Sequence, residues 1–445
     1  MTDDELPVTD HEALRAYVWG DAWLQQADLL QDVLHRAGRR RHYQPHVMLL
    51  FWYGTTGIWR SARRAVAQLR QPEVWTFLQR NVLERFPDRP HLWLPDVPPR
   101  RYHYLYFRRH VMEPCVDEIN ALHEAVAAGQ ARELGLCDPE GSGSWNNPHP
   151  SRTATGDGKV VAPLFRGKNG KTRLDRETGE LCPVRFDPDA KLHVAGDGRF
   201  QFGTKFSFMH VRGEDRHARV ILAVRPTIKD SEGKTIVGLI AGVANRLPGL
   251  QALVYDGGLR GEHLNAVLKA GILPVAPAHG LKSDKEQVAR MLQRVGPRTV
   301  YTHLGLLGVG HLTETGDLAF EPLRRRNLLR RQRSDGTYRW YGEYTDANGD
   351  FRIRVDQTTG DVQAKRNRCE NLRTFARGDG VFERLMGGRN DSESLNRYLE
   401  DSLFNGRAHS IGRVRQHIDM LGFATAVNAV AVYRHRARHG PPTPR

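Results

Sequence analysis

Residues 218–277 alternate between strand-like and helix-like segments, and this order constrains the fold more than any other feature of the chain. The segments "ARVILAVRPTI" (218–228) and "LQALVYDGG" (250–258) are rich in β-branched and aromatic residues, which is typical of strands. Between them, "SEGKTIVGLIAGVANRLPG" (231–249) has the composition of a helix, and "LRGEHLNAVLKAG" (259–271) predicts the next one. A short apolar segment, "GILPVAP" (271–277), predicts a further strand.

Two more strand-like segments precede this region. They are "TATGDGKVVAPLF" (153–165) and "GTKFSFMHVRG" (203–213). A group of strands followed by strand–helix alternation predicts an α/β fold in which helices flank a mixed sheet.

The first 130 residues have helical periodicity instead. "TTGIWRSARRAVAQLRQPEVWTFLQRNVLERF" predicts two helices, the first capped by Thr55 or Thr56 and the second beginning near Pro72. The most apolar stretch, "HVMLLFWYGTTGIW" (46–59), is shorter than the ~20 residues that span a bilayer. We therefore expect a helical N-terminal domain and no membrane partner.

The remaining segments differ from one another in composition. Residues 138–152 are rich in turn formers, residues 311–367 combine an arginine run with strand-like segments, and the segment from 390 to 436 is helical again. The predicted boundaries are 1–137 for the helical domain, 138–310 for the first part of the core, 311–368 for a β-rich basic insertion, 369–436 for the closing helices of the core and 437–445 for a flexible tail.

The charge balance favours a polyanionic partner. Lys and Arg number 66 against 51 Asp and Glu, which gives a net charge of +15. Nucleic acid is the simplest such partner. The four cysteines form no Cys-x-x-Cys pair, and the acidic N-terminus has no apolar signal region, so we expect a cytoplasmic protein.

Two aspartates share one sequence context. Asp157 and Asp256 each follow a strand-like segment and precede a glycine, and they are 99 positions apart. On neighbouring strands their carboxylates would lie close together and repel, unless a cation were present. Hard divalent cations such as Mg²⁺ or Mn²⁺ prefer oxygen ligands and would remove that penalty. The alternative is that both residues only form turns.

A third carboxylate lies in "GGRNDSESLNRYLEDSL" (387–403), which predicts a helix after a glycine break. Glu393 would share one helix face with Arg389 and Arg397, opposite a buried stripe of Leu395, Tyr398, Leu399 and Leu403. Alternatively, Glu393 completes a capping arrangement that begins at Asn390.

Asp157, Asp256 and Glu393 occur in an order that resembles that of the DDE transposases of bacterial insertion sequences, and the resemblance covers residues 150–435. "GDGK" is similar to the family's first-aspartate strand, and "VYDGGLRGEHL" to its second, with the pattern Asp-x-x-x-Arg-Gly. Arg389 and Glu393 match the middle pair of the Tyr-Arg-Glu-Lys helix signature of one group, whose outer positions are here Met386 and Glu400. That group has a β-rich insertion between the second Asp and the Glu, as expected here.

The resemblance implies an RNase H-like catalytic core and phosphoryl transfer on DNA. Asp157, Asp256 and Glu393 would bind two Mg²⁺ or Mn²⁺ ions, cut double-stranded DNA at the element's terminal repeats and join the ends to target DNA. A homodimer assembled on DNA, at the nucleoid of a bacterium, is expected by analogy. The alternatives are a transposase-derived DNA-binding protein without catalysis and an RNase H-like nuclease without strand transfer.

Several basic and aromatic residues are candidates for DNA contact. The arginine run 324–333 would contact phosphates, Trp340 would either stack on an unpaired base or pack inside the β-element, and the segment around residue 60 would form part of a helix-turn-helix. The full set of predicted DNA-binding residues is Arg60, Arg63, Arg64, Arg260, Arg324, Arg325, Arg326, Arg330, Arg331, Arg333, Trp340, Arg389 and Arg397.

Overall fold

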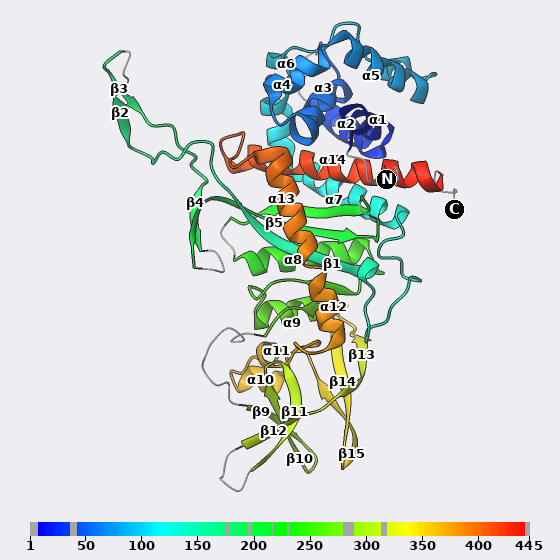
Figure 1. Ribbon diagram of the computed structural model, residues 1–445, viewed down its shortest axis with the longest axis vertical. Helices are drawn as coiled ribbons and strands as arrows, with labels where there is room; N and C mark the ends of the chain where they lie inside the picture. Colours follow the sequence, from blue (N-terminus) through cyan, green and yellow to red (C-terminus); the bar gives the residue numbers. More distant parts are fainter. Residues whose placement is uncertain are drawn as a thin grey trace. The chain divides into compact units, whose positions relative to one another are not determined.

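The chain folds into two compact units in a computed structural model. The described residues are 8–35, 42–174, 178–194, 198–215, 217–228, 231–278, 289–312 and 318–440. Unit 1 consists of residues 1–134, 158–228 and 394–445, and unit 2 of residues 135–157 and 229–393. Figure 1 shows the order of the elements along the chain. The strand β1 (Thr153–Val161) contributes residues to both units.

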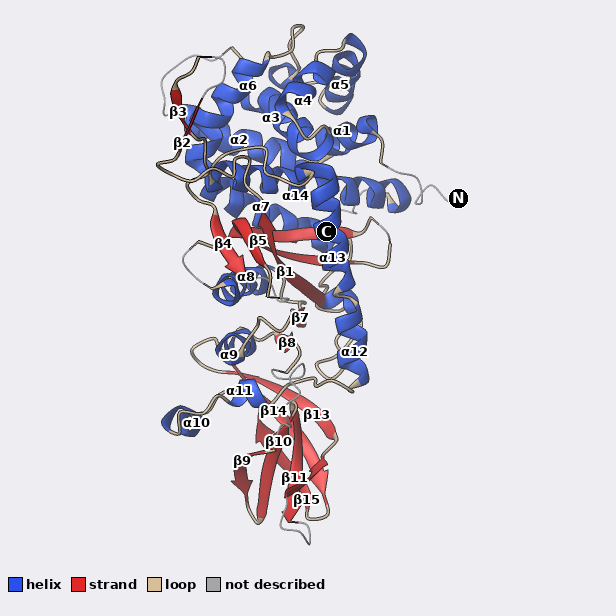
Figure 2. Cartoon of the chain, turned by 60° about the vertical axis from the view of Figure 1, so that its left-hand side comes forward, coloured by secondary structure: helices blue, strands red, loops and turns tan. Residues whose placement is uncertain are grey.

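Unit 1 is built around helices, as the periodicity predicts, and Figure 2 shows them as one group. Every residue of α3 is buried, and α14 is buried along most of its length, because apolar residues surround both helices. The helices are α1 (Asp10–Trp19), α2 (Asp21–His35), α3 (Pro45–Tyr53), α4 (Ala62–Leu69), α5 (Pro72–Arg85), α6 (Arg101–Phe107), α7 (Val116–Glu133) and α14 (Arg413–His439).

The predicted cap at Thr55 or Thr56 is wrong, whereas Pro72 begins α5 as expected. Residues Gly54–Ile58 continue α3 as a π-helical turn, and α4 starts only at Ala62. The two threonine hydroxyls donate to the carbonyls of Phe51 and Trp52, four residues earlier, so they bond back into the preceding helix. No helix in the described part of the chain is long and apolar enough to cross a membrane.

The predicted strands form a six-stranded mixed sheet. Its order is β4-β5-β1-β7-β8, with β6 paired to β5, and β1, β7 and β8 run parallel. The strands other than β1 are β4 (Lys191–Val194), β5 (Phe200–Arg212), β6 (Arg219–Pro226), β7 (Ala252–Val254) and β8 (Leu273–Val275). The predicted helices after β6 and β7 are α8 (Glu232–Arg246) and α9 (Gly261–Lys269).

Side chains from two helices of unit 1 satisfy the backbone of β6. Asn428 of α14 accepts from the Ile221 N–H at 2.7 Å and donates to the Ile221 carbonyl at 3.0 Å. His123 of α7 also contacts the Ile221 carbonyl, and His417 of α14 contacts that of Val224, both at 3.1 Å. These contacts replace the ladder that a strand beyond β6 would have provided.

Unit 2 contains two further antiparallel sheets, which begin at Arg290, earlier than residue 311. The first has the order β12-β11-β10-β9, with β9 (Arg290–Val295), β10 (Arg298–His303), β11 (Leu306–Leu312) and β12 (Leu318–Pro322). The second is β13 (Arg325–Gln332), β14 (Tyr338–Asp346) and β15 (Gly349–Arg354). The short helices α10 (Thr359–Gln363), α11 (Arg368–Asn371) and α12 (Gly380–Gly387) follow.

Trp340 packs inside unit 2. Its side chain is fully buried, and its indole N–H donates to the Leu268 carbonyl at 2.7 Å. The ring also meets Trp145 edge-on, with 5.2 Å between centroids. The structure therefore favours the packing role over stacking on a base.

The helix that carries Glu393 is α13 (Asn390–Leu399), which continues as a π-helical turn over Glu400–Phe404. Leu395, Leu399 and Leu403 form its buried stripe, but Tyr398 is 46% exposed and does not belong to it. At the other end of the sequence, α14 continues to His439, and residues 441–445 of the predicted tail lie outside the described residues.

Candidate active site

Asp157 and Asp256 both lie just beyond the paired part of two parallel strands. Thr153, Ala154 and Thr155 of β1 pair with Ala252, Leu253 and Val254 of β7. Each pair is 99 positions apart, which is also the separation of the two aspartates. The pairing ends at Thr155 and Val254; continued for two residues, the same register would match Asp157, still within β1, with Asp256, which follows the end of β7. Both side chains are partly buried. In a parallel pair, residues at matching positions lie on the same face of the sheet.

Local structure fixes the backbone of Asp256. Its Oδ1 accepts a hydrogen bond from the Gly258 N–H at 2.8 Å, the contact of an Asx turn. This is the turn-forming role expected as the alternative. The Asx turn uses only Oδ1 of Asp256, which accepts from one N–H, and Oδ2 takes no part in the turn.

Tyr255, which precedes Asp256, links the two strand ends. A Cβ at Gly156 would lie 2.9 Å from the Tyr255 ring, so the absence of a side chain there lets the ring pack beside β1. The Tyr255 hydroxyl donates to a carboxylate oxygen of Glu232 in the first turn of α8. Burial raises the pKa of Tyr255 well above its ordinary value, and the nearby charges of Glu232, Asp256 and Asp157 raise it further.

Glu232 and Tyr255 were not among the residues predicted from the sequence. The glycine before Asp157 and the large aromatic residue before Asp256 occupy matching positions 99 residues apart. A comparison of the two segments in that register would have paired them. No pattern in the sequence indicated Glu232, because its contact with Tyr255 depends on how α8 packs against the sheet.

Replacing Gly156 by alanine is expected to destabilise unit 2 by about 1–3 kcal/mol, because the new methyl group must displace the Tyr255 ring. Chemical denaturation followed by fluorescence measures this change. Gly257→Ala is the matched control, since a Cβ there meets no atom within 4 Å. Equal stability of the two variants would show that the ring does not pack on Gly156 as described.

The structure does not bring Glu393 into a cluster with the two aspartates. Its side chain is 64% exposed and forms an ion pair with Arg389 at 3.5 Å. No group of three or more His, Cys, Asp or Glu side chains that could hold a metal occurs within the described ranges. Arg389 and Glu393 do share one helix face, as the spacing predicts, but the acidic pair and the acidic helix residue remain separate.

Two other predicted DNA-binding arginines make ion pairs of their own. Arg260 donates to Glu370 at 2.7 Å, and Glu370 also accepts from the Gly261 N–H at the start of α9. Arg397 pairs with Asp401 at 3.6 Å on an exposed surface. The Arg397 pair is fully at the surface, and exposed ion pairs contribute little to stability, whereas Glu370 is largely covered and also bonds the backbone.

The arginine run divides between the two faces of the three-stranded sheet, because successive strand residues point in opposite directions. Arg330 lies on the inner face, where its guanidinium is 3.9 Å from the Trp145 ring centroid and donates to the Gly271 carbonyl at 3.0 Å. Arg325 donates to the Thr374 carbonyl and stacks over Phe375 at 4.8 Å. These two arginines therefore stabilise unit 2.

The outer face of this sheet is the basic one. Arg331 and Arg339 are directly opposite each other on β13 and β14, an arrangement that costs stability because like charges repel. Three guanidinium groups, those of Arg331, Arg352 and Arg354, lie 5.8–5.9 Å from the centroid of the Tyr341 ring. Arg352 and Arg354 are also paired with Glu343 and Asp356, so the charge around this ring is partly neutralised. The exposed Arg331 beside the Tyr341 ring is the part of this face that suits a nucleic acid strand.

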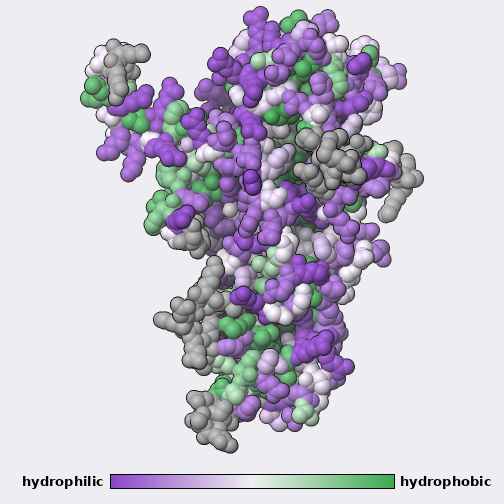
Figure 3. Space-filling model, in the orientation of Figure 1, coloured by the Kyte–Doolittle hydropathy of each residue, from purple (hydrophilic) through white to green (hydrophobic). Residues whose placement is uncertain are grey.

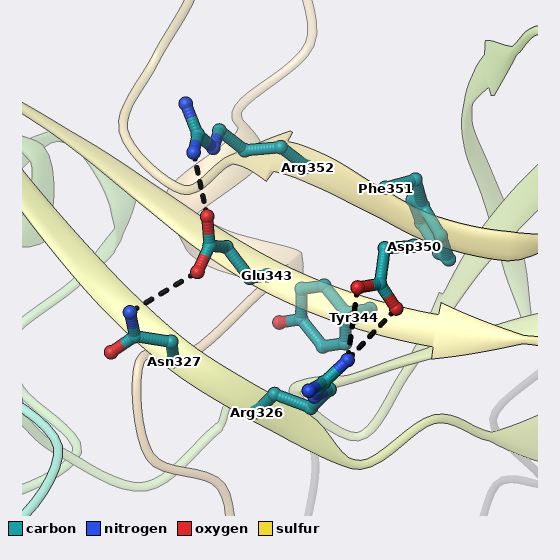
Figure 4. Close-up of a pocket in the computed structure, with 7 residues that line it drawn as sticks. All are labelled: Arg326, Asn327, Glu343, Tyr344, Asp350, Phe351 and Arg352. Atoms are coloured by element: carbon teal, nitrogen blue, oxygen red, sulfur yellow. Dashed lines mark hydrogen bonds and ion pairs between the residues drawn. The ribbon is translucent and has the colours of Figure 1, made fainter.

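A hollow of about 480 Å³ lies at the other end of the same sheet (Figure 4). Glu343 accepts from Arg352 at 2.6 Å and from Asn327 at 3.1 Å, and Asp350 pairs with Arg326 at 2.9 Å. The hydrogen bond from Arg352 lowers the pKa of Glu343. Acidic and basic groups neutralise one another here, so the hollow has no strong preference for an anion.

The remaining predicted arginines are exposed. Arg324, Arg326, Arg331 and Arg333 of the run are accessible, although Arg326 pairs with Asp350 and Arg333 with Asp335. In unit 1, Arg63 and Arg64 lie on the exposed side of α4, and Arg60 lies in the turn before it with φ 61°. The opposite side of α4 is buried through Ala65, Val66 and Leu69.

No protein-family model matches this chain, and a search of curated proteins found no match.

Proposed function

We propose that the chain is a metal-dependent DNA-cleaving and DNA-joining enzyme of the DDE transposase type, with an RNase H-like core. The observation that carries this proposal is the common register of Asp157 and Asp256. Asp157 is on the central strand of a mixed sheet, and Asp256 follows the neighbouring parallel strand. Ligands of open α/β sheets bind beyond the carboxyl ends of such strands.

The donor groups at this position fit a hard divalent cation. Carboxylates that lie close together repel each other unless a cation is bound, and oxygen donors are the ligands that Mg²⁺ and Mn²⁺ prefer. The charges of Asp157, Asp256 and Glu232 all act on the Tyr255 phenol, so negative charge is concentrated around that side chain. A bound divalent ion would supply Lewis-acid activation of a water or 3′-hydroxyl and stabilise the oxygen that leaves.

The protein's own residues would orient the reaction. Asp157 and Asp256 would hold the ion, and the Tyr255 ring, packed beside Gly156 and anchored to Glu232, would keep the two strand ends in register. Glu393 would enter this set only after its ion pair with Arg389 is exchanged. The net charge of +15 and the exposed arginines Arg324 and Arg331 support double-stranded DNA as the substrate. Such an enzyme would act at the nucleoid of a bacterial cytoplasm.

The test is metal-dependent cleavage of a labelled duplex that carries the DNA bordering the gene. With Mg²⁺ or Mn²⁺ we expect nicked products, and products joined to a second duplex would identify strand transfer. Asp157→Asn and Asp256→Asn should each lower the rate by more than about 100-fold while DNA binding is retained, because the metal loses a carboxylate ligand. Asp88→Asn, at an exposed position of unit 1, is the control and should retain full activity.

Unchanged cleavage by both active-site variants would refute the assignment of Asp157 and Asp256. Cleavage without any joined product would identify a nuclease. The exposed position of Glu393 favours one further candidate, a transposase-derived protein that binds DNA without cutting it. DNA binding with no cleavage in either metal would support that candidate.

A further inference from the structure

A basic and aromatic segment of unit 1 has no part in the proposed reaction. The sequence "PPRRYHYLYFRRHVM" (98–112) contains four arginines and two histidines but no Asp or Glu. Residues Arg101–Phe107 of this segment form α6, and Arg108–Met112 continue as a π-helical turn. What the segment can bind depends on which of its side chains reach the surface.

One side of α6 packs in the core and the other is exposed. Tyr104 and Phe107 are buried, whereas Tyr102 is 61% and Tyr106 50% exposed. Residues four apart are neighbours on the surface of a helix, so these two tyrosines lie on the same side, about 6 Å apart along the axis. Large aromatic rings gain from burial, and two exposed rings side by side therefore suit a partner.

The ring of Tyr102 is supported by a second ring. It lies beside His103, with 3.9 Å between centroids, and His103 lies 4.8 Å from the buried Tyr43. His103 Nδ1 accepts from the Arg100 N–H at 3.0 Å, which fixes the imidazole at the start of α6. Burial and nearby positive charges lower the pKa of His103, so this ring is neutral at pH 7. Tyr102 therefore packs beside a fixed, uncharged ring.

Arginines accompany the two exposed tyrosines. Arg100, Arg101 and Arg109 are exposed on either side of them in the sequence. The fourth arginine, Arg108, is buried and paired with Asp419 at 2.9 Å, so it belongs to the core. Figure 3 shows mainly hydrophilic residues over the part of unit 1 where α6 lies in Figure 1. The exposed side of α6 therefore combines positive charge with aromatic rings.

We propose that this surface, Arg100, Arg101, Tyr102, Tyr106 and Arg109, binds single-stranded DNA, with unpaired bases on the tyrosine rings and phosphates on the arginines. Stacking on exposed aromatic rings beside positive charge is how proteins hold single strands without sequence preference. The bases of a duplex are stacked on one another, so a tyrosine ring can stack only on a base that is unpaired. The choice of DNA over RNA rests on the proposed function, whereas the stacking does not.

Binding of a labelled oligothymidylate of about 16 nucleotides to the full chain in EDTA, measured by fluorescence anisotropy, tests the proposal. Tyr102→Ala/Tyr106→Ala should weaken binding at least about 10-fold, because two stacking platforms are lost. Tyr102→Phe/Tyr106→Phe is the matched control, since it keeps both rings, and it should bind within about twofold of the wild type. Both variants should bind a labelled duplex as the wild type does.

The dependence on salt separates charge from stacking. For a single strand, the slope of log affinity against log salt concentration changes by about 0.7 for each phosphate contact. Arg101→Gln/Arg109→Gln should therefore make this slope shallower by about 1.4, the sum for two contacts. Tyr102→Ala/Tyr106→Ala removes no charge and should keep the wild-type slope.

Three results would overturn the proposal: a wild type that does not bind oligothymidylate, an alanine variant that binds it as the wild type does, or equal losses for single strand and duplex. Oligouridylate bound about tenfold more tightly than oligothymidylate would overturn it in favour of RNA. Circular dichroism spectra should be the same for all variants, because both tyrosines are exposed. EDTA removes divalent metal, and Asp256→Asn should bind like the wild type, so failure here is distinct from failure of the cleavage test.

Discussion

Unit 1 is expected to lose stability steeply between pH 6.5 and pH 4, because three histidines are buried there in their neutral form. Burial lowers the pKa of His46, His123 and His417 to about 4 each. In the unfolded chain the same groups take up a proton near pH 6.5. The unfolded state therefore binds more protons throughout this window, and stability falls as the pH falls. The loss approaches about 3 kcal/mol per histidine at pH 4.

Two of these histidines have a structural reason to stay neutral. His123 and His417 contact backbone carbonyls of β6 through Nε2, at Ile221 and Val224. One ring N–H satisfies each carbonyl, and a second proton would place an unpaired charge in the core. Burial lowers the pKa of each ring by more than the hydrogen bond to the carbonyl raises it, so the ring is neutral at pH 7.

Thermal unfolding at intervals from pH 7 to pH 4 measures the effect. His417→Gln keeps an N–H donor but does not titrate, so it should lower the melting temperature at pH 7 and reduce its fall with pH. His110→Gln, at an exposed position, is the control and should leave the dependence on pH unchanged. Equal pH dependence in all three proteins would show that the buried histidines do not control acid stability.

The strands that carry Asp157 and Asp256 could be predicted from the sequence, because strand propensity depends on the residues of each segment itself. β-branched runs mark β1, β6 and β7, and the separation of Asp157 and Asp256 equals the register found in the structure. Alternation within β13 could also have divided the arginine run between two faces. All six arginines of residues 324–333 were predicted to contact DNA, but Arg325 and Arg330 donate hydrogen bonds to backbone carbonyls inside unit 2.

Features that depend on packing between distant segments could not be predicted in this way. The contact between Tyr255 and Glu232 requires α8 to start beside the end of β7. Thr55 has the composition of a cap, but its hydroxyl bonds back to Phe51 because α3 does not end there. The side of α6 that Tyr102 and Tyr106 share follows from their spacing, whereas its exposure does not, because exposure depends on what the rest of the chain covers.

Asn428→Ala is expected to lower the stability of unit 1 by about 2–4 kcal/mol, since it removes both hydrogen bonds to Ile221 and leaves a buried N–H without its acceptor. Asn428→Asp should cost more, because a carboxylate still accepts from the Ile221 N–H but repels the Ile221 carbonyl in a buried site. Urea denaturation measures both changes, and His439→Ala at the exposed end of the same helix is the control. Losses in this order, with an unchanged control, would show that α14 takes the place of a missing strand beside β6. A neutral Asn428→Ala would instead show that water satisfies this edge of the sheet, and that the packing of α14 alone keeps β6 in place.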